Sequence, residues 1–221
     1  MAEIRDVVVV HGLWHQPAHF ELLKAALTEL GIAVTVPALH RGSLTEDTTA
    51  VQRVVDESRI APVVVGHSYG GAVITGLTGI HHLVYVAAFV PDTGESSVAL
   101  GGRDSLINDA VTVRLDRSTE IVASKARDCL YADCSELEAN RAIDLLVSQA
   151  PGHGRGVPQH IAWRDTASTY VVCEQDRALD PNLQRHMSRH CTNVVSMAAS
   201  HSPFLSRPAE LAELIAAIAR S

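Results

Sequence analysis

The sequence predicts an α/β protein built on a mostly parallel sheet of about six strands, with helices covering both faces. Short apolar runs rich in valine alternate with longer segments whose apolar residues recur at helical spacing. The first run, residues 7–10, is four successive valines, which is typical of a strand buried on both faces. Strands and helices that alternate in this way favour one parallel sheet, and 221 residues suffice for its core.

The first ninety residues contain four expected strands and three expected helices. Phe20, Leu23 and Leu27 lie on one face of the first helix, and Gly31 ends it. The strands are expected at 7–10, 32–36, 63–65 and 83–88, and the helices at 17–30, 44–59 and 72–77.

The alternation stops between residues 92 and 159. This stretch contains two expected helices, at 118–126 and 135–147, but no convincing core strand. A structureless connection of this length would be unusual inside a compact domain, so we expect a helical lid there. The predicted organisation is a single core, formed by 1–91 and 160–221, with the lid inserted at 92–159.

The alternation then resumes and continues to the end of the chain. An apolar run that leads into two later loops is expected to extend the same sheet. The strands are expected at 168–173 and 194–197, and the helices at 181–189 and 208–219.

Composition excludes several classes of partner. The formal net charge is −7 and there is no basic cluster, which argues against nucleic acid. The apolar runs are only strand-length, so no transmembrane helix is expected, and the acidic amino terminus leaves no room for a signal peptide. We therefore expect a cytoplasmic protein without a membrane partner. The expected partner is a small molecule, and a homodimer is left open.

The four cysteines do not indicate a metal site. Cys129, Cys134, Cys173 and Cys191 show no paired spacing of the kind that zinc sites have. Cys129 and Cys134 could form a disulfide, but nothing else in the sequence indicates an oxidising compartment. No metal or organic cofactor is expected.

A Gly-x-Ser-x-Gly pentapeptide follows the expected strand at 63–65. Gly66, Ser68 and Gly70 form this motif, and a short apolar helix is expected directly after it. A serine between a strand and a helix in this motif is typical of a nucleophile elbow, a sharp turn that lifts the hydroxyl clear of the sheet. The glycines are required because a side chain would strike the neighbouring backbone. The sequence therefore predicts nucleophilic chemistry at Ser68.

A serine hydroxyl needs a base within hydrogen-bond reach and an acid that orients the base. Of the 12 histidines, His201 alone follows an expected strand in the right order after Ser68. His67 is expected to point away from its neighbour Ser68, and His153 lies in a loop that no strand positions. The sequence predicts His201 as the base.

Asp176 is the favoured acid because it follows the expected strand at 168–173 and precedes His201. Three other carboxylates remain alternatives. Asp180 fits better at the start of the following helix, Glu174 lies nearer to the strand, and Asp92 follows an earlier strand.

An oxyanion hole needs backbone N–H groups that are aimed at the developing negative charge. The residue after the nucleophile, Tyr69, is expected to supply one. The loop after the first strand is expected to supply the other, from Leu13, with Gly12 permitting the turn.

With these residues assembled, the chain resembles the α/β-hydrolase superfamily, in its compact branch of methyl esterases, hydroxynitrile lyases and small bacterial carboxylesterases. The segments that carry the resemblance span nearly the whole chain except the lid, at residues 8–15, 66–71, 170–178 and 200–206. It implies the α/β-hydrolase fold, with Ser68 as nucleophile, Asp176 as acid and His201 as base.

Two positions depart from the lyases of that branch. Gly12 stands where the plant lyases have a threonine, and Ser202 follows the histidine where they have a lysine that holds cyanide. Cyanohydrin cleavage is therefore not expected. Aspartate-nucleophile dehalogenation is excluded by Ser68.

The expected activity is that of a carboxylesterase on small, mostly apolar esters. Phe89, Trp163 and Tyr131 are the expected substrate-binding residues. Hydrolysis of amides, thioesters or carbon–carbon bonds would use the same residues, and a small-molecule receptor on the same fold is the remaining alternative.

Overall fold

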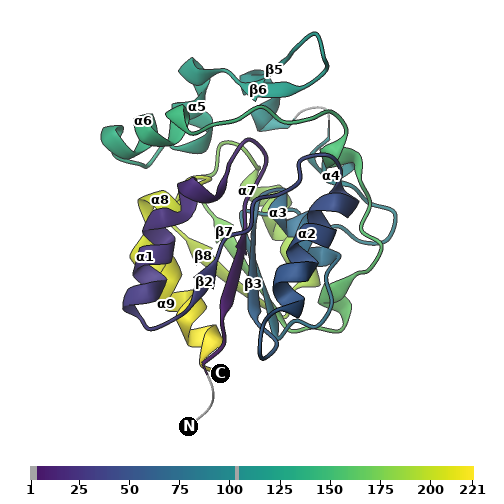
Figure 1. Ribbon diagram of the computed structural model, residues 1–221. Coiled ribbons are helices and arrows are strands. Elements are labelled where there is room, and N and C mark those ends of the chain that lie inside the picture. The colour runs from purple at the N-terminus through teal and green to yellow at the C-terminus, as the bar shows by residue number, and fades with distance from the viewer. Residues whose placement is uncertain (1–3, 103–104) are drawn as a thin grey trace.

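The computed structural model describes residues 4–102 and 105–221 and contains a six-stranded sheet (Figure 1). The strand order is β2-β1-β3-β4-β7-β8, and every neighbouring pair is parallel. The predicted mostly parallel sheet of about six strands is thus confirmed. The strands are β1 (Val7–Val10), β2 (Val34–Thr35), β3 (Val63–His67), β4 (His82–Val86), β7 (Ser168–Cys173) and β8 (Asn193–Met197).

Helices cover both faces of the sheet, and each face has its own apolar core. Val7 and Val9 of β1 belong to one core and Val8 and Val10 to the other, because successive side chains of a strand point to opposite faces. The first core is covered by α1 (Glu21–Glu29), α8 (Pro203–Ser206) and α9 (Pro208–Ala219), and the second by α2 (Leu44–Asp56), α3 (Gly70–Thr75) and α7 (Pro181–Met187). Short 3₁₀ turns at Pro17–Phe20, Ala162–Arg164 and Ser188–His190 complete these layers.

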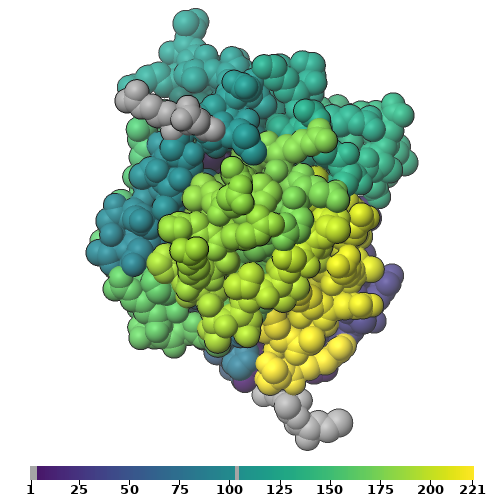
Figure 2. All heavy atoms as spheres, turned by 180° about the vertical axis from the view of Figure 1, so that it is seen from behind, coloured from purple at the N-terminus to yellow at the C-terminus, as the bar shows by residue number. Residues whose placement is uncertain are grey.

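The segment between β4 and β7, residues 92–159, adds no strand to this sheet among its described residues; we call it the insertion. It lies across one end of the sheet in Figure 1, in teal, and Figure 2 shows the same position from behind. Its elements are α4 (Ser97–Gly101), a 3₁₀ turn (Leu106–Ala110), β5 (Val111–Val113), β6 (Thr119–Ile121), α5 (Ala123–Leu130), α6 (Glu136–Asp144) and a 3₁₀ turn (His153–Arg155).

The prediction of a helix at 118–126 is wrong in its first half. Thr119 to Ile121 instead pair antiparallel with Val111 to Val113, and the helix begins only at Ala123. β-branched residues on both sides allow this hairpin, and a local helix pattern is overridden by the pairing. The helix expected at 135–147 ends earlier, at Asp144.

The insertion shares the first core rather than forming one of its own. Leu130, Tyr131 and Ala139 lie in the same buried cluster as residues of α1 and α9. All four cysteines lie in the described part of the chain and are free thiols, so Cys129 and Cys134 are not bridged here. None of the helices in the described ranges is long and apolar enough to cross a membrane.

The elbow between β3 and α3 fits against neighbouring backbone without room for side chains. A Cβ atom at Gly70 would lie 2.3 Å from the carbonyl oxygen of Val10, and one at Gly66 would lie 2.7 Å from that of Gly70. Real Cβ atoms do not approach backbone so closely, so both positions require glycine.

We therefore expect Gly70→Ala to lower the free energy of unfolding by at least about 2 kcal/mol, because backbone atoms of β1 would have to move. Urea denaturation measures this change. Gly101→Ala is the matched control, since its Cβ would meet only ordinary contacts at 3.6 Å from the Phe89 ring. Equal effects of the two substitutions would contradict this account of the elbow.

Candidate active site

Ser68 lies at the turn from β3 into α3 with a φ of 54°. Few non-glycine residues adopt this left-handed conformation, and such strain is often held at functional sites by the surrounding structure. The Ser68 amide donates to the carbonyl of Val86, and the Ser68 carbonyl accepts from the amides of Gly71 and Phe89. These three hydrogen bonds hold the turn against β4 and α3, and the half-buried side chain faces a cavity.

His201 and Asp176 form a buried hydrogen-bonded pair on the loops that follow β8 and β7. His201 Nδ1 lies 2.8 Å from Asp176 Oδ2, and both residues are at most 4% exposed. The loops meet because the parallel register places Cys173 opposite Met197 at one edge of the sheet. A carboxylate can only accept, so Nδ1 carries the proton and Nε2 of His201 is left as an acceptor.

The other candidate carboxylates are engaged elsewhere. Glu174 pairs with Arg185 and accepts from the hydroxyl of Ser196. Asp180 caps α7 by accepting from the amide of Asn182, and Asp92 pairs with Arg164. Among the described residues, Asp176 alone bonds to His201.

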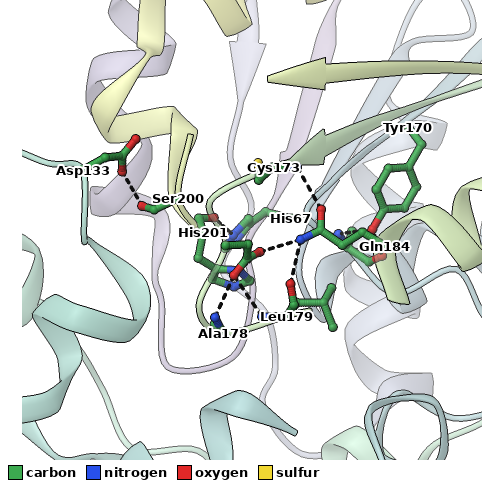
Figure 3. A network of polar contacts seen from close by, with 11 residues as sticks. His67, Asp133, Tyr170, Cys173, Ala178, Leu179, Gln184, Ser200 and His201 are labelled. Carbon is green, nitrogen blue, oxygen red and sulfur yellow. Dashed lines mark hydrogen bonds and ion pairs between the residues drawn. The ribbon is translucent and has the colours of Figure 1, made fainter. Parts of the chain in front are cut away.

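Asp176 is itself held by donors that the sequence analysis did not anticipate (Figure 3). Its Oδ1 accepts from the backbone amides of Ala178 and Leu179, at 2.7 and 2.9 Å. Gln184, from α7, donates to Asp176 Oδ2 and to the Leu179 carbonyl, both at 2.8 Å, while its Oε1 accepts from the amide of Cys173. This buried glutamine fixes the carboxylate relative to the end of β7. A lone glutamine on a short helix gives no sequence signal for this role.

Leu13 and Tyr69 lie on two loops that the sheet brings together. The register pairs Val10 with Gly66, and a Cβ at Gly12 would lie 2.9 Å from Ser68 Cβ, so the first loop passes directly over the elbow. Neither the Leu13 nor the Tyr69 amide donates a hydrogen bond among the described interactions. The Tyr69 side chain is buried and donates to Asp47 Oδ2 at 2.9 Å, which anchors the start of α3.

A cavity of about 220 Å³ opens above Ser68 and His201, and we call it the site cavity. Its walls are mainly apolar, and the insertion supplies many of them. The core contributes Leu13, Trp14, Phe89 and Leu179, while the insertion contributes Val98, Ile107, Val111 and Leu130.

Of the three expected substrate-binding residues, Phe89 lines the site cavity and the other two do not. Tyr131 is fully buried in the first core, where its hydroxyl donates to His15 Nε2. Trp163 stacks on His190 and donates to the carbonyl of Pro91. Aromatic residues near the insertion were expected to face the substrate, but both are used to fix loops. His153, which no strand positions, does line the cavity.

The loop after β1 is tied to the insertion by long-range hydrogen bonds. Trp14 adopts a left-handed φ of 61°, and its amide donates to the buried side chain of Gln149 at 3.1 Å. Its indole N–H donates to Thr119 Oγ1 at 3.2 Å, and its carbonyl accepts from the amide of Val147. The backbone next to Leu13 is therefore held from the side of the insertion.

The chain matches the family model described as "Alpha/beta hydrolase family" over residues 7–214. The chain belongs to the α/β hydrolase family. The resemblance stated from its sequence motifs is thereby confirmed.

Relatives of this α/β hydrolase include named esterases and hydrolases. It is 29% identical to the α/β hydrolase nvfD of Aspergillus novofumigatus, with 91% of each chain covered. It is 28% identical to a carbendazim hydrolyzing esterase of a Nocardioides species, over 96% of this chain and 99% of that protein. Its structure is similar to that of a pyrethroid hydrolase from Sphingobium faniae, with a TM-score of 0.87, 21% identity and 98% of each chain covered. This last likeness shows the fold alone.

Four buried histidines surround the base of the α/β hydrolase site, each with a defined tautomer or partner. His67 Nε2 donates to the carbonyl of His201 at 2.9 Å, and its Nδ1 is buried without a described partner. His11 donates from Nδ1 to the Gly12 carbonyl and accepts at Nε2 from the amide of Leu39. His15 and His19 each donate to one backbone carbonyl and accept from Tyr131 and the amide of Gln16, respectively.

Burial keeps these four rings neutral. It lowers the pKa of His11 to about 4 and that of His19 below its usual value. The pKa values of His15 and His67 are lowered well below the usual value by burial, and the neighbouring histidines act in the same direction.

We expect this burial to make the protein acid-sensitive. Between about pH 6.5 and the lowered folded pKa, the unfolded chain binds protons that the folded chain excludes, so stability falls as pH falls. For His11, the fall from pH 6.5 to 5 should be about 1–2 kcal/mol.

Urea denaturation of the wild type and His11→Gln at pH 7.5, 6.5 and 5 measures this. The variant should lose less stability on acidification, and its stability at pH 7.5 reports the separate cost of the substitution. Parallel curves for the two proteins would refute the His11 contribution.

We expect Gln184→Met to lower the free energy of unfolding by roughly 2–4 kcal/mol, because it strands the Asp176 carboxylate and the Cys173 amide without a partner. Gln52→Met is the matched control. The Gln52 amide also makes three hydrogen bonds, to Asp56 and to both backbone groups of Thr78, but at an exposed site. It should cost less than about 1 kcal/mol, and a similar loss for both variants would count against the role of Gln184.

Proposed function

We propose that this α/β hydrolase is a serine carboxylesterase that cleaves small, mostly apolar esters. The observation that carries the proposal is the buried hydrogen bond from His201 Nδ1 to Asp176, with Ser68 and His201 lining the same apolar cavity. The names of two relatives, an esterase and a pyrethroid hydrolase of Sphingobium wenxiniae that is 25% identical, support ester hydrolysis.

In the first step, Ser68 Oγ attacks the ester carbonyl carbon and its proton passes to Nε2 of His201. Asp176 accepts from Nδ1, which keeps Nε2 free to take the proton and stabilises the imidazolium that forms. The carbonyl oxygen becomes an oxyanion, for which the Leu13 and Tyr69 amides are the donors. Collapse of the tetrahedral intermediate expels the alcohol, which receives the proton from His201.

In the second step, water attacks the acyl-enzyme with His201 again as the base. The acid leaves and the Ser68 hydroxyl is restored, so the net reaction is ester plus water to acid plus alcohol. Apolar walls on both sides of Ser68 favour acyl or alkoxy groups without charge next to the ester.

The test is hydrolysis of p-nitrophenyl acetate and butyrate, together with labelling by a fluorophosphonate probe. We expect turnover and labelling by the wild type, and a loss of at least about 10⁴-fold in kcat for Ser68→Ala, because serine and histidine act as a unit. Ser206→Ala, which removes a buried hydroxyl in α8 outside the site cavity, is the control and should stay active.

An unlabelled wild type without turnover would overturn the esterase proposal. A small molecule that binds tightly and is released unchanged would then indicate a receptor on the same fold.

A further inference from the structure

A second hollow, of about 600 Å³, adjoins the site cavity on the side of the insertion; we call it the outer hollow. Four residues line both spaces, so the outer hollow begins where the site cavity ends. They are Val98, Thr119, His153 and Gly154. The remaining walls come from β5, the turn after it and the segment 151–155. A ligand with its ester at Ser68 can therefore extend past these shared residues into the outer hollow.

Two arginines line the outer hollow, and no carboxylate does. Arg117 and Arg155 are both exposed, and neither side chain makes an ion pair among the described residues. This contrasts with Arg114, Arg164, Arg177 and Arg185, each of which pairs with a carboxylate. Two uncompensated guanidinium groups that face one space attract an anion.

The acidic groups near the outer hollow are already occupied. Glu120 pairs with Arg114, and Asp116 Oδ1 accepts from the amide and the hydroxyl of Ser118. Burial lowers the pKa of His153, so this residue adds no positive charge at neutral pH. Arg117 and Arg155 thus supply the local positive charge in a chain whose net charge is −7.

The remaining walls of the outer hollow are apolar. Val98 and Val113 are 47% and 66% exposed, and Pro151 lies beside them. Apolar walls with guanidinium groups match an apolar chain that ends in a carboxylate, because arginine binds a carboxylate through two parallel hydrogen bonds.

We propose that the outer hollow binds a free carboxylate of the substrate, and that the preferred esters carry this carboxylate remote from the scissile bond, as half-esters of dicarboxylic acids do. The inference rests on the proposed esterase function for its reaction, but the binding of the carboxylate does not depend on turnover. Arg117 and Arg155 are specificity residues in this proposal.

The first test compares matched p-nitrophenyl esters. Mono-p-nitrophenyl adipate, suberate and sebacate are compared with the hexanoate, octanoate and decanoate of the same acyl length, and the ratio of kcat/KM, anionic over neutral, is the readout. We expect a maximum in this ratio at one chain length. There it should fall about threefold in Arg117→Gln or Arg155→Gln and about tenfold in the double variant, in line with partly exposed ion pairs.

Arg53→Gln is the matched control, because it removes one exposed positive charge on α2, away from both spaces. Its ratio should equal that of the wild type. The double lysine variant, Arg117→Lys with Arg155→Lys, keeps the charge and should retain more of the preference than the double glutamine variant. An unchanged ratio in the double glutamine variant at every chain length would overturn the proposal.

The second test separates binding from catalysis. Calorimetry with Ser68→Ala measures the affinity for monomethyl suberate and for dimethyl suberate. We expect the half-ester to bind about tenfold more tightly, and the difference to vanish when both arginines are replaced by glutamine. If the wild type hydrolyses no ester but this difference holds, the esterase function fails and the carboxylate site stands. If the wild type hydrolyses esters but shows no such difference, the carboxylate site fails alone.

Discussion

The hydrogen bond between His201 and Asp176 sets the requirements that the surrounding structure meets. It demands that two loops, 25 residues apart in the chain, meet with sub-ångström accuracy at a buried position. The parallel pairing of β7 with β8 brings the loops to one edge of the sheet. Gln184 and the amides of Ala178 and Leu179 then satisfy the remaining lone pairs of the carboxylate. A buried carboxylate without these donors would carry a large desolvation cost.

Polar contacts of the same kind connect the insertion to the loops around Ser68 and His201. Ser200, directly before His201, donates to Asp133 of the insertion (Figure 3), and Gln149 holds the amide of Trp14 beside Leu13. His19 extends these links, since its Nε2 donates to the carbonyl of Ala142 in α6. Because these bonds are buried, a shift of the insertion would leave polar groups unpaired, so the insertion and the site are coupled mechanically.

The work is divided between the sheet and the insertion. The strand ends position Ser68, Asp176 and His201, the groups that our proposal assigns to bond making and breaking. The insertion adds walls of the site cavity and nearly all those of the outer hollow. A substitution in the insertion can therefore change which molecules fit while the hydrogen bonds of Asp176 stay in place. Function on this fold resides in such added walls rather than in the sheet.

The sequence by itself determined the strands, most of the helices and the place of the elbow, because these depend on local patterns: valine runs, helical spacing, and glycines that backbone contacts require at Gly66 and Gly70. The order of Ser68, Asp176 and His201 along the chain also identified the residues that the sheet brings to one edge. Contacts between distant segments could not be predicted in this way. The pairing of Thr119 to Ile121 with β5 overrode a helix pattern, Gln184 reached Asp176 from a neighbouring helix, and Tyr131 turned into the core to bond to His15. Only the tertiary structure decided these, since a side chain's partner depends on which segments pack beside it and not on its own neighbours in sequence.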